Sequence, residues 1–123
     1  MAVLAALLVG VVAAIHVYIV VLEMVLWRTP RGMRSFGTDQ AFADRSAALA
    51  ANQGLYNGFL VAGLVWGLLA ADPIGFQVRV FFLGCVIVAG LYGGATVSRR
   101  ILVVQALPAA LALAAVILTA NVA

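Results

Sequence analysis

The segment NQGLYNG, residues 52–58, places four polar side chains in a stretch that otherwise consists of Ala, Leu, Val, Gly and aromatic residues. These side chains are Asn52, Gln53, Tyr56 and Asn57. Their spacing of i, i+1, i+4 and i+5 predicts one polar stripe on a helix, and the surrounding residues are typical of a membrane span. Polar groups at membrane depth are costly unless they face a partner or a cavity. We therefore expect other polar residues of the chain to gather against this stripe.

The composition places the chain among membrane proteins. Of its 123 residues, 67% are hydrophobic and 9% are charged, with a mean hydropathy of +1.22. Soluble domains carry about 25% charged residues. The length fits a single domain, residues 1–123, with enough apolar residues for four helices of about 20 residues each. The net charge of +3 is too small and too dispersed for nucleic-acid binding.

We predict an all-α fold, a bundle of four transmembrane helices at about residues 2–27, 39–71, 76–97 and 101–121. The first run is long enough to span and has no basic segment before it, which favours a helix over a secretory signal. Proline and glycine residues predict a loop over 28–38 and a tight turn at 72–75. Thr38 or Asp39 is the expected N-cap of the second helix. That helix is expected to protrude on the cytoplasmic side, because its length of about 50 Å exceeds a hydrocarbon core of about 30 Å.

Arginine residues are concentrated in two of the three expected connections. Three of them lie within residues 28–34, and Arg99 and Arg100 lie between the third and fourth helices. The remaining connection carries only the acidic Asp72. The positive-inside rule therefore predicts that both arginine-rich connections are cytoplasmic and that both termini are outside. We expect one fixed orientation.

Each expected helix carries polar residues about 5–10 Å inside the cytoplasmic boundary. In chain order these are Glu23, then Asn52, Gln53, Tyr56 and Asn57, then Tyr92 and Thr96, and finally Gln105. We predict that they line a polar chamber open to the cytoplasmic leaflet, with His16 about 10 Å deeper as its floor. The arginines expected just above the chamber are Arg45, Arg99 and Arg100. Glu23 is expected either to handle protons or to form an ion pair with one of these arginines.

The chamber suggests chemical roles for these side chains. Glu23 and His16 are candidates for proton transfer, and Tyr56 or Tyr92 for hydrogen bonding to developing charge. The predicted substrate-binding residues are Arg45, Asn52, Gln53, Asn57, Thr96, Arg99, Arg100 and Gln105. The alternative is structural, with the amides joining helices and His16 satisfied in the core. No metal site is predicted, since His16 has no second ligand at metal spacing, and the sequence indicates no particular cofactor.

Three segments resemble the signatures of a small four-helix membrane family, domain of unknown function 1304. They are IHVYIVVLEMVLW (15–27), ANQGLYNGFLVAGLVWG (51–67) and LYGGATVSRRILVVQALPA (91–109). The resemblance covers nearly the whole chain. It implies a four-helix protein of the bacterial inner membrane, which is the plasma membrane of the cell. It implies no activity.

A more distant analogy is with the microsomal glutathione transferases. Arg45 precedes Asn52 by seven residues, as an Arg precedes an Asn in that family, and Tyr92 with Arg99 resembles its Tyr/Arg pairs toward glutathione. The chain departs from the pattern at Leu55, where the family has an acid, and at Ser-Ala-Ala after Arg45. In this analogy Arg45, Arg99 and Arg100 would hold an anionic group such as a carboxylate or a thiol cosubstrate.

Three functions remain open. The first is a membrane enzyme or binding protein, transferase-like or isomerase-like, acting on a small lipophilic or anionic substrate at the cytoplasmic leaflet. The second is a small proton-coupled exporter using Glu23. The third is a non-enzymatic interaction subunit. The expected partners are membrane lipids and further copies of the chain, joined through small-residue pairs. These pairs are Gly54/Gly58, Gly63/Gly67 and Gly90/Gly94.

Overall fold

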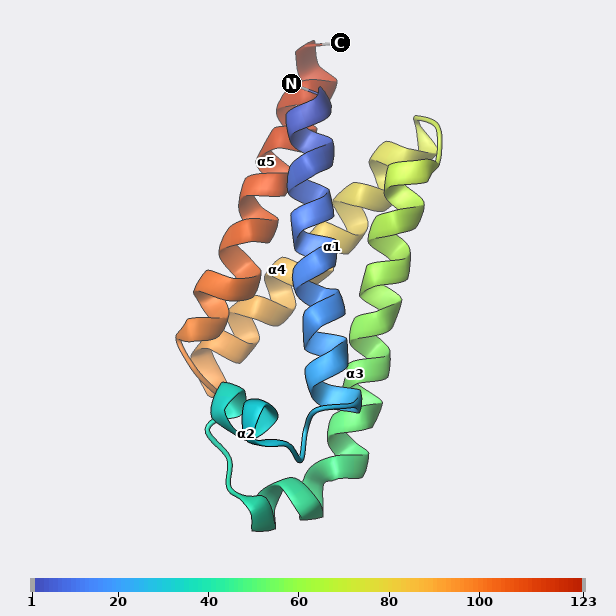
Figure 1. Ribbon diagram of the computed structural model, residues 1–123. Coiled ribbons are helices and arrows are strands. Elements are labelled where there is room, and N and C mark those ends of the chain that lie inside the picture. The colour runs from blue at the N-terminus through green and yellow to red at the C-terminus, as the bar shows by residue number, and fades with distance from the viewer. Residues whose placement is uncertain (1, 123) are drawn as a thin grey trace. The chain divides into compact units, whose positions relative to one another are not determined.

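A computed structural model describes residues 2–122, which form helices and turns without a strand. The elements are α1 (Ala2–Met24), α2 (Pro30–Phe36), α3 (Gln40–Leu69), α4 (Ile74–Thr96), the π-helical η1 (Leu102–Ala106) and α5 (Leu107–Val122) (Figure 1). The all-α fold class is therefore confirmed. The chain divides into two compact units. One unit comprises the chain up to Ile15 together with the chain from Leu60 onward, and the other is His16–Phe59.

Three helical segments among residues 2–122 are long and apolar enough to cross a membrane. They are Ala2–Met24, Ile74–Thr96 and Leu102–Val122. The helix α3 is not one of them, because polar residues such as Asn52, Gln53 and Asn57 interrupt its apolar sequence. The chain is thus an all-α protein with membrane-type helices, while four spans and the orientation stay predictions.

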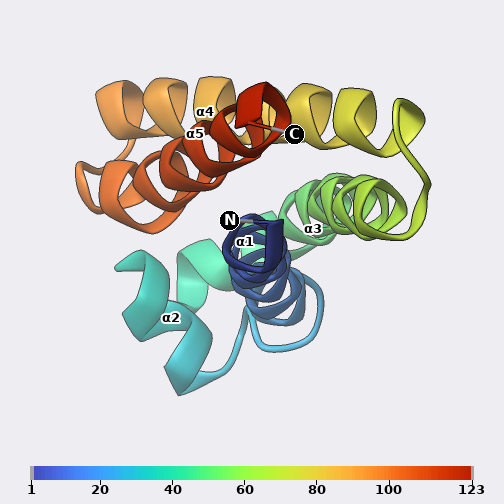
Figure 2. The same cartoon turned by 90° about the horizontal axis from the view of Figure 1, so that it is seen from above.

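The larger unit has a core of small and branched side chains. Val9 of α1, Leu64 of α3, Leu83 and Val86 of α4, and Ala109 of α5 are fully buried in it. The alanines of α5 permit a close approach, and α4 and α5 lie side by side near the connection that joins them (Figures 1 and 2). Burial of these side chains joins the helices of this unit.

Two of the predicted glycine pairs pack within the larger unit. Gly63 faces the ring of Phe82, and Gly67 faces the stem and backbone of Arg79. Gly90 and Gly94 face Ala106 and Leu102 in the same manner. A Cβ atom at Gly90 would lie 2.8 Å from the Ala106 backbone nitrogen. These four glycines serve helix contacts inside the chain, while a homo-oligomer through glycine pairs stays a prediction.

The segment 28–38 contains a helix, which corrects the prediction of a loop. The Thr29 hydroxyl accepts a hydrogen bond from the Gly32 backbone N–H at 3.3 Å, and Pro30 occupies the first turn. Proline is favourable there, because the first N–H groups of a helix have no partner within it. Gly37, with φ of 67°, ends the helix in the left-handed conformation. Pro30 and Gly37 thus begin and end α2.

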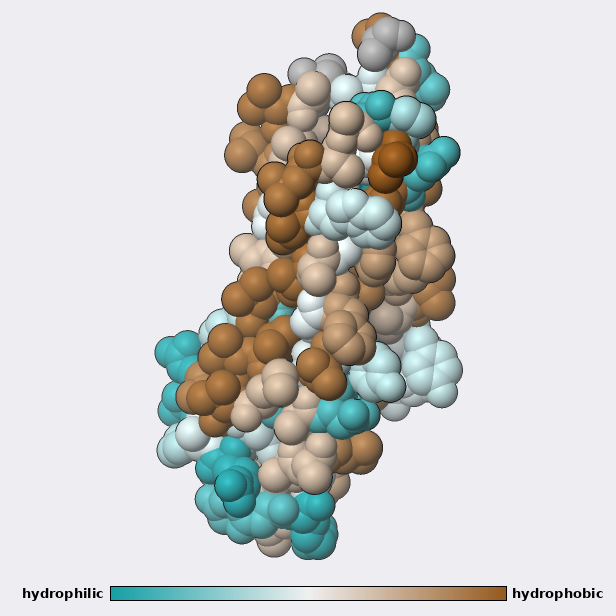
Figure 3. Space-filling model, turned by 90° about the vertical axis from the view of Figure 1, so that its right-hand side faces the viewer, coloured by the Kyte–Doolittle hydropathy of each residue, from teal (hydrophilic) through white to brown (hydrophobic). Residues whose placement is uncertain are grey.

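In the smaller unit, the connection between the end of α1 and the start of α3 contains α2. The helix α1 ends at Met24, and Trp27 in the following turn donates a hydrogen bond to the Ser46 hydroxyl at 3.1 Å. The Asp39 carboxylate accepts from the Phe42 N–H at 2.8 Å, so Asp39 is the cap of α3. Figure 3 shows hydrophilic side chains at the lower end, where α3 begins, and more hydrophobic side chains above them.

A π-helical turn lies directly before Pro108. Proline has no N–H to donate to the carbonyl four residues earlier. The Leu107 N–H reaches the carbonyl of Leu102, five residues back, which is the π-helical pattern. The helix is therefore locally widened just before Pro108.

Candidate functional site

The smaller unit places a carboxyl group against an amide at the end of α1. The Asn57 Nδ2 of α3 donates a hydrogen bond to Glu23 Oε1 at 2.6 Å. The Glu23 side chain is almost buried, with 5% of its surface exposed. Gly54 permits this approach, since a Cβ atom there would lie 2.5 Å from Met24 Cγ and 3.1 Å from Glu23 Cβ. Glu23 and Asn57 therefore join α1 to α3.

The two oxygens of Glu23 have different surroundings. Oε1 accepts the amide hydrogen bond, whereas Oε2 has no hydrogen-bond partner among the described residues. Among residues 2–122, Thr38 Oγ1 is the one fully buried side-chain nitrogen or oxygen without a hydrogen-bond partner, so Oε2 is not fully enclosed. One oxygen of a nearly buried carboxyl group therefore lacks a hydrogen-bond partner among the described residues and is not fully enclosed.

Arg45 does not neutralise Glu23. Within residues 16–59, no ion pair joins the two, and Arg45 is exposed. It precedes Asn57 by twelve residues, which corresponds to about 18 Å along α3. This distance exceeds the reach of an arginine side chain, and the expected pair with Arg45 is therefore absent.

The polar stripe on α3 is wide. Asn52 and Asn57 lie about 140° apart around the helix, at 100° per residue. Asn57 lies at the edge of the stripe and contacts Glu23. Asn52, Gln53 and Tyr56 are exposed. Tyr56 packs edge-on against Phe59, with ring centroids 5.6 Å apart. The structure brings one of the four residues to the carboxyl group.

His16 lies on the same face of α1 as Glu23. Its side chain is 1% exposed, and it has an interaction partner. Their separation of seven positions corresponds to about 10 Å along the helix. Residues 2–122 contain no group of three or more His, Cys, Asp or Glu side chains that could hold a metal ion.

The remaining predicted site residues belong to the larger unit. Tyr92 is 73% exposed, and the Thr96 hydroxyl donates to the Tyr92 carbonyl at 2.7 Å. Gln105 is half-buried in the π-helical turn, and Arg99 and Arg100 are exposed. A single chamber that joins these residues to Glu23 stays a prediction.

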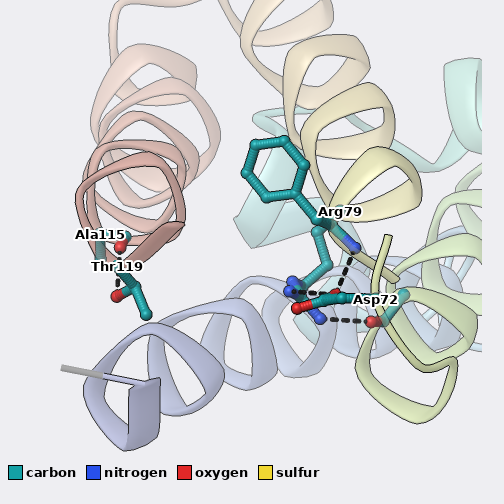
Figure 4. A network of polar contacts seen from close by, with 6 residues as sticks. Asp72, Arg79, Ala115 and Thr119 are labelled. Atoms are coloured by element: carbon teal, nitrogen blue, oxygen red, sulfur yellow. Dashed lines mark hydrogen bonds and ion pairs between the residues drawn. The ribbon is translucent and has the colours of Figure 1, made fainter. Parts of the chain in front are cut away.

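A second polar cluster, which sequence reasoning did not assemble, lies within the larger unit. The Arg79 guanidinium donates to the Gly67 carbonyl at 2.7 Å and forms an ion pair with Asp72 at 3.2 Å. Figure 4 shows Arg79 beside Asp72, with Thr119 on α5. Asp72, Arg79 and Thr119 line a cavity of about 290 Å³. The available signal was the separation of seven positions between Asp72, in the turn before α4, and Arg79 in the second turn of α4.

The helices, together with the hydrogen bond between Glu23 and Asn57, define an all-α protein with membrane-type helices and a polar site. The chain belongs to the family described as "Protein of unknown function (DUF1304)", whose model matches residues 10–117. The resemblance seen in the sequence is thus confirmed. No curated protein and no solved structure matches the chain.

Proposed function

We propose that this protein is an integral membrane protein of the bacterial inner membrane that binds a small lipophilic molecule at Glu23 and Asn57. The observation that carries the proposal is Oε2 of a nearly buried carboxyl group, which accepts no hydrogen bond from the described residues and is not fully enclosed. Membrane-embedded carboxyl groups are rare and mark functional sites by default. In this proposal the arginine-rich connections lie on the cytoplasmic side, so the site opens near that leaflet.

The chemistry of the pair favours a ligand that brings a hydrogen-bond donor or a positive charge to Oε2. Asn57 holds Oε1 and fixes the carboxyl plane, which orients Oε2 toward the ligand. A carboxyl group held in this way can give or accept a proton, as a transferase or an isomerase requires. A part for Tyr92, Thr96, Gln105, Arg99 and Arg100 in binding stays a prediction from the sequence, in which the arginines hold an anionic group of the substrate.

The test is ligand-induced thermal stabilisation of the purified full chain in detergent. The panel contains lipophilic amines, quinones, fatty acids and glutathione. A ligand at a hundredfold excess over its Kd stabilises by about 2.7 kcal/mol. We expect at least one ligand to stabilise the wild type, and Glu23→Gln and Asn57→Ala to abolish that effect.

Asn52→Ala is the matched control. It removes the same type of side chain from the same helix, at an exposed position away from Glu23. We expect it to keep the ligand response of the wild type. The proposal is wrong if Glu23→Gln and Asn57→Ala respond like the wild type to every ligand that binds.

The absence of an Arg45 pair also favours a second candidate, proton-coupled export. An unpaired carboxyl group in an apolar helix can exchange a proton for a cationic substrate. Proton flux in proteoliposomes driven by a lipophilic cation, and lost in Glu23→Gln, would establish export. No flux, with ligand binding intact, would favour the binding protein or enzyme. No binding and no flux would favour the interaction subunit, in which copies of the chain are the expected partner.

A further inference from the structure

The cavity beside Arg79 lies where three membrane-type segments reach their ends. Its wall includes Ala2 in the first turn of α1, Asp72 just before α4 and Thr119 in the last turns of α5. Arg79 is five residues into α4, which corresponds to about 8 Å. This is the depth of the boundary between lipid headgroups and acyl chains if α4 begins at the membrane surface.

The Arg79 guanidinium is held in place and keeps donors to spare. Nη1 donates to the Gly67 carbonyl and Nη2 pairs with Asp72 Oδ1, while a guanidinium has five N–H donors. The side chain is 19% exposed. The remaining donors can bind the oxygens of a phosphate group, for which the fork of an arginine is well suited.

Asp72 presents the opposite charge beside this guanidinium. Its Oδ1 accepts from the Phe76 N–H at 2.9 Å and from Arg79, whereas Oδ2 has no hydrogen-bond partner among the described residues. The Asp72 side chain is 66% exposed. Oδ2 is therefore available to an ammonium group next to the phosphate position.

The rest of the cavity wall is mostly apolar, with alanines of α1 on one side and Phe76 and Val116 on the others. Its volume of about 290 Å³ is close to the lower end of ligand pockets, about 300 Å³. Such a space takes a headgroup, and acyl chains would follow the apolar helices outside it.

From these observations we infer that the cavity binds the headgroup of a zwitterionic phospholipid, with the phosphate on Arg79 and a primary ammonium on Asp72. Two opposite charges held side by side match a headgroup that carries both. An anionic headgroup would meet the same Arg79 but would also approach the carboxylate of Asp72 without a compensating ammonium. The site therefore selects phosphatidylethanolamine over phosphatidylglycerol.

The test measures lipid affinity of the full chain in detergent by titrating the two lipids with identical acyl chains and following thermal stability. We expect the wild type to bind phosphatidylethanolamine about tenfold more tightly than phosphatidylglycerol, the effect of one charge-assisted hydrogen bond. Asp72→Asn keeps an acceptor for Phe76 and Arg79, so it should fold and lose this preference. Equal affinity of the wild type for both lipids would overturn the inference.

Two further variants locate the site. Ala6→Phe fills the cavity from an exposed position of α1 and should abolish the preference, whereas Ala114→Phe, on an exposed position of α5 outside the cavity, should keep it. A preference that survives in Ala6→Phe would place lipid binding elsewhere. The last measurement titrates soluble phosphoethanolamine in place of the lipid. If it binds as tightly as the lipid, the ligand is a free solute and the lipid assignment is wrong.

Discussion

Glu23 and Asn57 form the contact on which the proposed function depends. The hydrogen bond between them is 2.6 Å long and joins residues 34 positions apart in the chain. A buried carboxyl group loses its solvation, and the amide of Asn57 replaces part of it. The contact therefore both stabilises the unit formed by residues 16–59 and orients the carboxyl group.

Replacement of Asn57 by alanine should destabilise the protein more than the same change at Asn52. Asn57→Ala leaves Glu23 Oε1 without its donor, at an expected cost of about 1–3 kcal/mol in the free energy of unfolding. Asn52→Ala changes an exposed position and should stay within about 0.5 kcal/mol. Thermal unfolding in detergent, followed by circular dichroism, measures both. Equal stability of the two variants would show that the hydrogen bond carries no net stabilisation.

At the scale of elements, close packing of α4 against the start of the last helix depends on glycine. Gly90 lies against the backbone of Ala106 in the π-helical turn, where rigid backbone atoms cannot move aside as a flexible side chain can. Gly84 lies on the same helix with nothing within 4 Å of an added Cβ atom. The two positions therefore separate packing from helix propensity.

Gly90→Ala should destabilise the protein by about 1–3 kcal/mol, because the added methyl group forces α4 and η1 apart. Gly84→Ala should be neutral or stabilising by up to about 1 kcal/mol, since alanine favours the helix. The midpoints of unfolding by heat in detergent give the comparison. A loss of stability in both variants would mean that helix contacts do not explain the need for glycine.

For the whole molecule, the arginine distribution predicts the orientation in the membrane. The connections at 28–38 and 97–101 are expected in the cytoplasm, with Asn121 near the C-terminus outside. The proposed site at Glu23 depends on this orientation, since the orientation places Glu23 near the cytoplasmic leaflet. Cysteine labelling of intact cells can establish it.

Single cysteines at Ser98 and Asn121, in a Cys85→Ser background, test the orientation. A membrane-impermeant maleimide should label Asn121→Cys in intact spheroplasts, and Ser98→Cys only after permeabilisation. Both positions are exposed in the structure, so access depends on the membrane rather than on packing. Partial labelling of both in intact spheroplasts would indicate dual topology.

The fold class, the membrane-type helices and the Asp39 cap were predictable because they depend on neighbouring residues. A run of apolar side chains or a capping carboxylate acts within a few positions of the chain, and its spacing reveals it. The helix α2 was not predicted, because proline and glycine destabilise the interior of a helix but are favourable at its ends. Thr29 before Pro30, and Gly37 after Phe36, place them at the ends.

The choice of Asn57 rather than Arg45 as the partner of Glu23 could not be predicted from the sequence. It depends on the axial register and rotation of α1 against α3, which the fit of Gly54 against Met24 establishes. The cavity of Asp72, Arg79 and Thr119 likewise requires three helices to end together. Sequence spacing fixes which residues share a helix face, but contacts between helices follow from packing of side chains that are far apart in the chain.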